Sequence, residues 1–408
     1  MDIKKSLVRR FISYTEFDTM SNPENAGKKV PTTEGQKDLI LQLEKELKAL
    51  GLETELDDTW VLSGVLKGNR KGRRIAFMAH VDTADDVMGN AVKANVIECY
   101  DGKDITLSSG AVISVEENPD LKKYEGGCII TSDGSTLLGS DDKAGVAIIM
   151  SALEYIKENP DFPHPDIEVY FTCDEETGAG MDNFPYERVS AKVCYTIDGA
   201  EEPYIEDECF NAASITINAK GNSIHLGSAR GKLVNAVTIL SHIASALPQA
   251  ESPEATDERY GYYCPLSLSG TQTEARLDVF IRDFDKAEFE HRIASVENLA
   301  KAISDIYRGT LEIESHVSYH NMGEINSKDS SAIDAIVSGG KNIGLDIKKT
   351  IIRGGTDGAR MAEKLGISCP NIFTGGHNLH SLKEWVSLDA MHRSALLVLE
   401  IMKIQVEA

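Results

Sequence analysis

The sequence predicts an α/β protein in which helices cover a mainly parallel central sheet, with a smaller α+β domain inserted into it. Three observations lead to this prediction. Strongly apolar strands alternate with helices on both sides of a central region, that region contains strands of a different kind, and 408 residues suffice for two to three domains of roughly 150 residues. We therefore expect residues 1–210 and 321–408 to form the larger domain and residues 211–320 the inserted one.

The larger domain is expected to contain four central strands. The runs IAFMAH, IEVYFTC, AKVCYTI and PNIFTG are short and continuously apolar, as strands buried on both faces of a parallel sheet are. Helical segments separate them. Residues 35–51 carry leucines at helical spacing and end at Gly51, residues 143–160 end at Pro160, and residues 391–406 form a further helix.

The inserted domain is expected to have strands with one face in water. Residues 213–220 and 274–284 alternate apolar and polar side chains, which is typical of such strands. They flank a predicted helix over residues 233–247. The polar, proline-containing residues 249–259 are expected to form an exposed loop.

Composition and charge exclude several classes of function. The 42 Lys and Arg against 65 Asp and Glu give a net charge of −23, which repels phosphate backbones and anionic lipids, so we expect neither nucleic acid nor membranes as partners. The seven scattered cysteines, with no C-x-x-C pair, predict reduced thiols and a cytoplasmic location. We see no secretory signal and no apolar run of about 18 residues.

Acidic and histidine side chains follow each predicted buried strand. Ligands of open α/β sheets bind beyond the carboxyl ends of the strands, so these side chains should converge in one crevice. Asp141, just before the predicted helix at residue 143, could point into the same place. The strand-end residues are His80, Asp82, Glu175, Glu176, Asp198 and His380.

Two imidazoles and several carboxylates form a ligand set that suits Zn²⁺, Mn²⁺ or Co²⁺. One catalytic ion needs only three protein ligands, so five candidates fit two ions better, with Asp141 as the bridging carboxylate. Asp82 could accept the other ring N–H of His80 and fix its tautomer. Within the Glu175-Glu176 pair, one carboxylate would bind metal while Glu175 acts as the general base for the attacking water.

Each of these residues also has an ordinary interpretation. Asp141 alone could be a helix N-cap, and His80 alone a hydrogen-bonded core histidine. Asp198 could be a turn residue before Gly199, and the two glutamates a solvated acidic run. Together they favour a metal site, because chance does not readily place histidine or acid at four buried strand ends.

Eight motifs occur in order between His80 and His380. They are HVDTAD, TLLGSDDKAG, FTCDEETG, TIDG, GNSIHLGSARGKLVNA, RDFD, IRGGTDGA and PNIFTGGHNLH. In these motifs the chain resembles the peptidase T family, the tripeptide aminopeptidases, within a wider group of dinuclear-zinc exopeptidases and deacylases. The resemblance extends over nearly the whole chain and implies a zinc-exopeptidase-like catalytic domain, with residues 211–320 as its lid.

The resemblance also implies roles for the site residues. Two Zn²⁺ ions per subunit, replaceable by Co²⁺ or Mn²⁺, would be held by His80 and Asp198 and by Glu176 and His380. Asp141 would bridge them, Glu175 would be the base, and Asp82 would orient His80.

On the lid, the resemblance implies that His225 polarises the scissile carbonyl, and that Asn235, Arg282 and Arg353 hold the polar ends of the substrate. The planar fork of arginine suits the terminal carboxylate that a tripeptide offers. Surface solvation is the plainer interpretation of these side chains. Leu226 departs from the family, which usually has proline after the histidine, and this leaves the loop less restrained.

We therefore expect a cytoplasmic aminopeptidase that removes the N-terminal residue of tripeptides. Its partners would be short peptides, and relatives suggest a homodimer through the lid domain as an option. The alternatives are a related dinuclear-zinc carboxypeptidase, an N-acyl amino acid amidohydrolase, or a non-catalytic peptide-binding relative. Only the aminopeptidase requires a free amine on its substrate. Blocking that amine therefore separates it from the carboxypeptidase and from the amidohydrolase.

Overall fold

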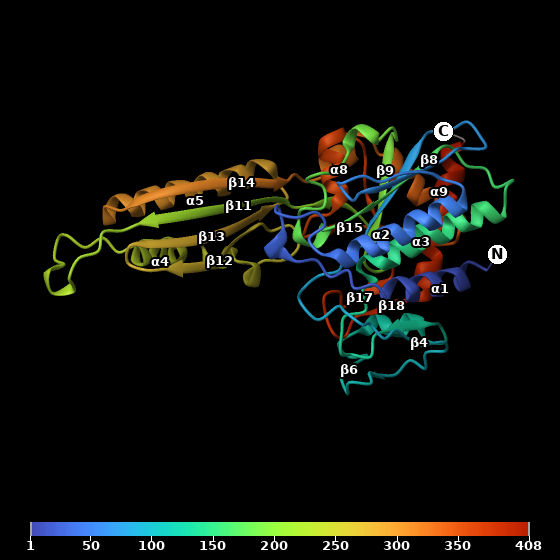
Figure 1. Cartoon of the computed structure of the whole chain (residues 1–408), viewed down its shortest axis with the longest axis horizontal. Coiled ribbons are helices and arrows are strands. Elements are labelled where there is room, and N and C mark those ends of the chain that lie inside the picture. Colours follow the sequence, from blue (N-terminus) through green and yellow to red (C-terminus); the bar gives the residue numbers. More distant parts are fainter. Residues whose placement is uncertain (1, 407–408) are drawn as a thin grey trace. The chain divides into compact units, whose positions relative to one another are not determined.

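The computed structural model describes residues 2–406, which divide into two compact units (Figure 1). Unit 1 comprises the chain up to Asp207, Met322–Thr350 and the residues from Thr356 onward; unit 2 comprises Glu208–Asn321 and Ile351–Gly355. None of the helices within residues 2–406 has the length and apolar character that crossing a membrane requires.

The core of unit 1 is an eight-stranded sheet in the order β1-β2-β8-β3-β9-β16-β10-β15. The central neighbours β8, β3, β9 and β16 pair in parallel, while β1, β2 and β10 pair antiparallel. The prediction of an α/β fold with a mainly parallel sheet centre is confirmed, and the four predicted strands are these central ones. The bounds are β1 Glu53–Glu55, β2 Leu62–Leu66, β3 Ile75–His80, β8 Ile167–Thr172, β9 Val193–Gly199, β10 Tyr204–Cys209, β15 Lys348–Ile352 and β16 Asn371–Phe373.

Helices pack against this sheet and against one another. α3 contacts β3 and β9 and also α1 and α9, and α8 contacts β9. The helix α2 ends where the sequence predicts, at Gly51, whose φ of 96° lies in the left-handed region that glycine adopts without strain. The bounds are α1 Ile3–Thr15, α2 Glu34–Leu50, α3 Ser140–Glu158, α6 Gly323–Lys328, α7 Ser331–Asn342, α8 Asp357–Leu365 and α9 Leu388–Val406.

Two small sheets and several short helices complete unit 1. One sheet has the order β17-β18-β7-β4, and the other pairs β5 with β6. Trp385 of β18 is buried there in a second apolar cluster with Tyr124. The bounds are β4 Asn95–Ile97, β5 Ile105–Thr106, β6 Val112–Ile113, β7 Ile129–Thr131, β17 Gly376–His377, β18 Trp385–Ser387, η1 Pro23–Asn25, η2 Pro119–Tyr124, η3 Glu175–Thr177 and η4 Tyr186–Arg188.

Unit 2 is a four-stranded antiparallel sheet, β12-β13-β11-β14, with α4 and α5 running alongside it (Figure 1). Alternate side chains of β11 and β13, such as Ile215 opposite Val279, pack with apolar residues of both helices. This explains the alternation that predicted strands with one wet face. The bounds are β11 Asn211–Lys220, β12 Tyr262–Gly270, β13 Glu274–Asp283, β14 Thr310–Tyr319, α4 Ala236–Ala246, α5 Lys286–Tyr307, η5 Leu226–Ser228, η6 Gln249–Glu251 and η7 Pro253–Ala255.

Candidate metal centre

The first group of metal-type ligands gathers around His80, the last residue of β3. Oδ1 of Asp141 lies 3.0 Å from Nε2 of His80, and Oδ1 of Asp198, in β9, lies 3.5 Å from the same nitrogen. Only 3% of His80 is exposed, so its ring is held in one place. Because β3 and β9 are parallel neighbours, both residues reach the same edge of the sheet.

The second group shares Asp141 with the first. Oδ2 of Asp141 lies 3.3 Å from Nε2 of His380, and Oε1 of Glu176 lies 3.2 Å from that nitrogen. Within each group the ligand atoms all lie within 4.8 Å of one another. The two oxygens of one carboxylate therefore face two different groups. We call His80, Asp141, Glu176, Asp198 and His380 the five candidate ligands.

The buried acids and imidazoles of these groups have shifted pKa values. Burial raises the pKa of Asp198 and of Glu176, each to about 7. Burial alone would lower the pKa of His80, but hydrogen bonds to Asp141 and Asp198 raise it well above its usual value. Hydrogen bonds to Asp141 and Glu176 raise the pKa of His380 to about 11. The acids and imidazoles thus share protons, and bound divalent cations would take the place of those protons. The imidazole and carboxylate donors fit such ions.

Asp82 contacts both His80, at the end of β3, and the turn that carries Glu175 and Glu176. The backbone carbonyl oxygen of Asp82 lies 3.1 Å from Nδ1 of His80 and its Oδ1 lies 3.3 Å from the same nitrogen, on the ring edge away from the ligand groups. The same carboxylate accepts hydrogen bonds of 3.1 Å from the backbone N–H groups of Glu175 and Glu176. Asp82 is fully buried. Its backbone carbonyl and carboxylate are both placed to orient the imidazole, and the carboxylate also fixes the turn that carries both glutamates.

Glu175 is half-buried and lies in the short helix η3 with Glu176. Burial raises the pKa of Glu175 well above its usual value. Asp174, just before it, adopts a left-handed φ of 63°, and its carboxylate accepts hydrogen bonds from the backbone and hydroxyl of Thr32 and from Gln36. Thr32 and Gln36 thus hold the side chain of Asp174, while Asp82 holds the backbone N–H of Glu175.

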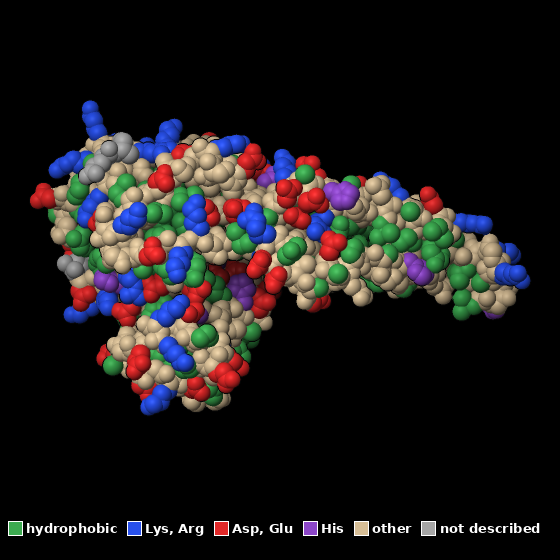
Figure 2. Space-filling model, turned by 180° about the vertical axis from the view of Figure 1, so that it is seen from behind, with side chains coloured by type: hydrophobic (Ala, Val, Ile, Leu, Met, Phe, Trp, Pro, Cys, Tyr) green, Lys and Arg blue, Asp and Glu red, His purple; other side chains and the backbone are tan. Residues whose placement is uncertain are grey.

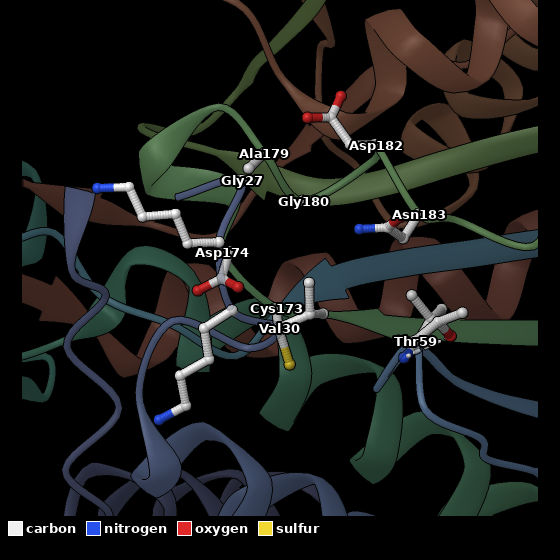
Figure 3. Close-up of a pocket in the computed structure, with 12 residues that line it drawn as sticks. Gly27, Val30, Thr59, Cys173, Asp174, Ala179, Gly180, Asp182 and Asn183 are labelled. Atoms are coloured by element: carbon white, nitrogen blue, oxygen red, sulfur yellow. Dashed lines mark hydrogen bonds between the residues drawn. The ribbon is translucent and has the colours of Figure 1, made fainter. Parts of the chain in front are cut away.

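A cavity of about 180 Å³ lies beside this turn and is lined in part by Cys173, Asp174 and Gly180 (Figure 3). Lys28 and Lys29 also line it. None of the five candidate ligands lines it, so it is separate from the metal-type groups.

Two further carboxylates support the centre without having been predicted. Oδ2 of Asp86 lies 3.1 Å from Nδ1 of His380, as Asp82 does for His80. Asp142 is fully buried and accepts hydrogen bonds from the backbone N–H groups of His80 and Gly145. The acidic doublets in TADD and SDDK were the available signals for both residues.

A third group, Asp120, Glu201 and His377, also has the composition of a metal site. Here Lys123 already supplies a cation, since its Nζ lies 2.6 Å from Oδ1 of Asp120 and 4.0 Å from Oε2 of Glu201. Burial lowers the pKa of His377 to about 4, and its ring stacks on Trp385 at 3.8 Å. These contacts are those of a packed, ion-paired cluster.

The four remaining predicted residues belong to unit 2. His225 is exposed, and its Nδ1 accepts a hydrogen bond from the N–H of Gly227. Asn235 caps α4 through the N–H of Thr238. Arg282 donates to the carbonyls of Ala213 and Ile281. Its guanidinium also lies over the rings of Phe280 and Tyr319. Arg353 donates to three backbone carbonyls, those of Thr256, Glu258 and Tyr260. Both arginines are therefore held in place by their own unit.

Comparison with known proteins identifies the family. Residues 133–403 match the sequence model of Peptidase family M20/M25/M40. Peptidase T of Caldanaerobacter subterraneus is 39% identical over 404 residues, covering 98% of each chain, and peptidase T of Bacillus licheniformis is 40% identical over 408 residues, covering 98% of this chain and 99% of that one. The chain belongs to the peptidase T family. The predictions of the family, of a metallo-aminopeptidase and of tripeptide aminopeptidase activity are confirmed.

Solved structures share the fold of this peptidase T family member. The aminopeptidase PepT from Bacillus cereus superposes with a TM-score of 0.77 at 23% identity, and a tripeptidase from Staphylococcus aureus with a TM-score of 0.78 at 21% identity. Each alignment covers 99% of both chains. A dinuclear metal-binding M20 peptidase from Bacillus subtilis gives a TM-score of 0.67 at 14% identity. The M20 family to which the chain belongs is metal-dependent, in agreement with the two ligand groups.

Proposed function

We propose that this peptidase T family member cleaves the N-terminal peptide bond of tripeptides at the five candidate ligands, with Glu175 as the general base. The main support for this proposal is the position of the Asp141 carboxylate. One of its oxygens faces His80 and the other faces His380, each at hydrogen-bond distance. This is the arrangement that one carboxylate needs in order to serve two ions at once.

We assign two Zn²⁺ ions to the centre, with Co²⁺ or Mn²⁺ as substitutes. His80 and Asp198 would hold one ion, Glu176 and His380 the other, and Asp141 both. Imidazole and carboxylate without thiolate is the ligand set that these metals accept in catalytic sites. When bound, such ions lower the pKa of water and polarise a carbonyl oxygen.

Glu175 is assigned the proton transfers. Its raised pKa favours transfer of a proton from the attacking water to this carboxylate, which can then deliver it to the leaving amine. Its backbone N–H is fixed by Asp82, which keeps it beside Glu176 without making it a ligand. A base needs this separation, because a carboxylate that binds a cation is a poor proton acceptor.

Unit 2 is assigned the role of the lid. In this proposal His225 donates to the carbonyl oxygen of the scissile bond, and Asn235, Arg282 and Arg353 hold the polar ends of the peptide. A guanidinium that receives the terminal carboxylate limits the length of the substrate. Arg282 and Arg353 are supported from one side by backbone carbonyls and aromatic rings, which stabilises a defined side-chain position.

We further propose that the enzyme works in the cytoplasm on short peptides and binds neither nucleic acid nor membranes. Its net charge of −23 supports this, because that charge repels both kinds of polyanionic surface. None of the seven cysteines, all of which lie within residues 2–406, forms a disulfide, which suits a reducing compartment. Association into a homodimer through unit 2 is part of the same proposal.

Product analysis tests the proposed activity. A tripeptide with a free amine should yield its N-terminal residue and a dipeptide, in the presence of Zn²⁺, Mn²⁺ or Co²⁺. The same peptide with an acetylated amine should resist cleavage, and a tetrapeptide should be cleaved slowly. Release of the C-terminal residue would favour a carboxypeptidase, removal of the acetyl group an amidohydrolase, and no hydrolysis of any peptide with both ions bound a peptide-binding protein.

A further inference from the structure

We propose that Glu384 is a positioning residue of the metal centre, which fixes the backbone that presents Asp141. The inference rests on the proposed function insofar as Asp141 binds metal. Nothing in the sequence singled out Glu384, which lies four residues after His380.

The carboxylate of Glu384 is enclosed by the segment that precedes Asp141. Its Oε2 accepts hydrogen bonds from the backbone N–H groups of Leu138 (2.7 Å) and Gly139 (2.9 Å). Its Oε1 accepts from the N–H of Ser140 (2.6 Å) and from the hydroxyl of Ser140 (2.5 Å). Glu384 is only 1% exposed, so these four bonds replace its hydration.

A carboxylate suits this position better than any neutral group. Three successive N–H groups before the regular part of a helix carry a partial positive charge and have no intrahelical acceptor. Charge-assisted bonds to such donors are roughly twice as strong as neutral ones. The amide of glutamine offers one oxygen, and its NH₂ group would face at least one of the N–H donors.

Asp141 depends on this support because its own backbone does not have the helical conformation that would fix it. Its φ of −87° and ψ of 106° are not helical, although it lies within α3. The direction of its side chain is therefore set by the residues just before it, which Glu384 fixes. Asp141 belongs to both ligand groups, so a small displacement would weaken the binding of both ions.

Glu384 also connects Asp141 to the segment that carries His380. Between His380 and Glu384 the chain forms a turn that closes on itself, since the side chain of Asn378 donates to the carbonyl of Lys383 and the hydroxyl of Ser381 donates to the carbonyl of Asn378. The same turn thus supplies one candidate ligand directly and fixes the backbone of another. This explains how ligands 239 residues apart keep one geometry.

The competing interpretation is that Glu384 only stabilises the fold, and Glu168 provides the matched control. Glu168 is also 1% exposed, lies in β8 and accepts hydrogen bonds from the backbone N–H groups of Ser190 and Ala191. These two residues lie before the start of β9, whereas Asp198 lies near its end. Loss of the Glu168 charge should therefore cost stability without disturbing the centre.

The test compares E384Q, E168Q and the unsubstituted protein. Zn²⁺ affinity of the metal-free proteins is measured by competition with a chromophoric chelator, and their stability by urea unfolding. E384Q should lower the apparent affinity for both ions by about 10- to 100-fold, the usual effect of losing a support of a metal ligand. E168Q should keep the normal affinity. Normal affinity in E384Q, or an equal loss in E168Q, would overturn the inference.

Milder substitutions cover the case in which E384Q does not fold. S140A removes one of the four hydrogen bonds and should lower the affinity several-fold, whereas S132A, at a buried serine of the same loop, should not. Equal affinities in these two variants would overturn the inference. D141A separates this result from the proposed function: if D141A itself retains both ions, the proposed centre fails, and not merely the role of Glu384.

Discussion

Asp82 holds Glu175 in place: its Oδ1 accepts a 3.1 Å hydrogen bond from the Glu175 backbone N–H while lying 3.3 Å from Nδ1 of His80. One buried carboxylate therefore contacts both the proposed general base and a candidate histidine ligand. This links the proton-transfer residue to the metal centre through a single side chain.

The substitution D82N should impair both functions at once. The amide cannot serve His80 and both glutamate N–H groups as the carboxylate does, so we expect Zn²⁺ affinity at the His80 group to fall about 10- to 100-fold. We also expect kcat to remain low when Zn²⁺ is saturating, because Glu175 loses its anchor. Steady-state kinetics at several Zn²⁺ concentrations measure both effects. D85N, at an exposed neighbour, is the control, and full recovery of D82N by added Zn²⁺ would argue against the link to Glu175.

The substitution E175Q should separate binding from chemistry. Glutamine has the shape of glutamate but cannot take a proton, so kcat should fall by about 10²- to 10⁴-fold. Metal content, measured by mass spectrometry of the purified protein, should remain at the normal value because Glu175 is not among the five candidate ligands. Turnover near the normal rate would rule out Glu175 as the base.

The substitutions H380A and H377Q distinguish two histidines of one loop. H380A should lose the ion of the Glu176 group and most activity, since only one nitrogen ligand serves that group. H377Q should retain both ions, because Lys123 already neutralises the acids near His377. Metal analysis after dialysis gives the answer. Equal metal loss in the two variants would show that the loop, and not His380 itself, determines binding.

The lowered pKa of His377 predicts that the stability of the folded protein depends on pH. Burial lowers its pKa to about 4 in the folded protein, against about 6.5 in an unfolded chain. Between these pH values the unfolded state binds more protons, so stability should decrease as the pH falls from 6.5 toward 4. Urea unfolding of the metal-free protein should show this loss, and H377Q should reduce it. Parallel stability curves for the two proteins would contradict this assignment.

Much of the candidate site could be predicted because its candidate ligands are marked locally in the sequence. His80 and Asp198 lie at the ends of β3 and β9, and His380 follows β16. The continuous apolar runs of these strands are unmistakable, and their parallel order brings their ends together. Asp82 could be predicted from the two-residue spacing after His80 alone. These inferences need only the period of a strand and the geometry of a sheet.

The missed residues act through tertiary contacts that leave no local pattern. Glu384 occupies an ordinary charged stretch, SLKEW, and becomes significant only because that stretch folds onto the residues before Asp141. Asp86 meets His380 across 294 residues. The outer strand β1 was missed for a different reason: its sequence, ETE, is polar, since an edge strand need not be buried.

The most direct test of the central claim is a crystal structure with anomalous diffraction recorded at the zinc edge. We expect two ions, one contacting His80 and Asp198, the other contacting Glu176 and His380, with Asp141 contacting both. A single ion, or two ions that do not share Asp141, would contradict it.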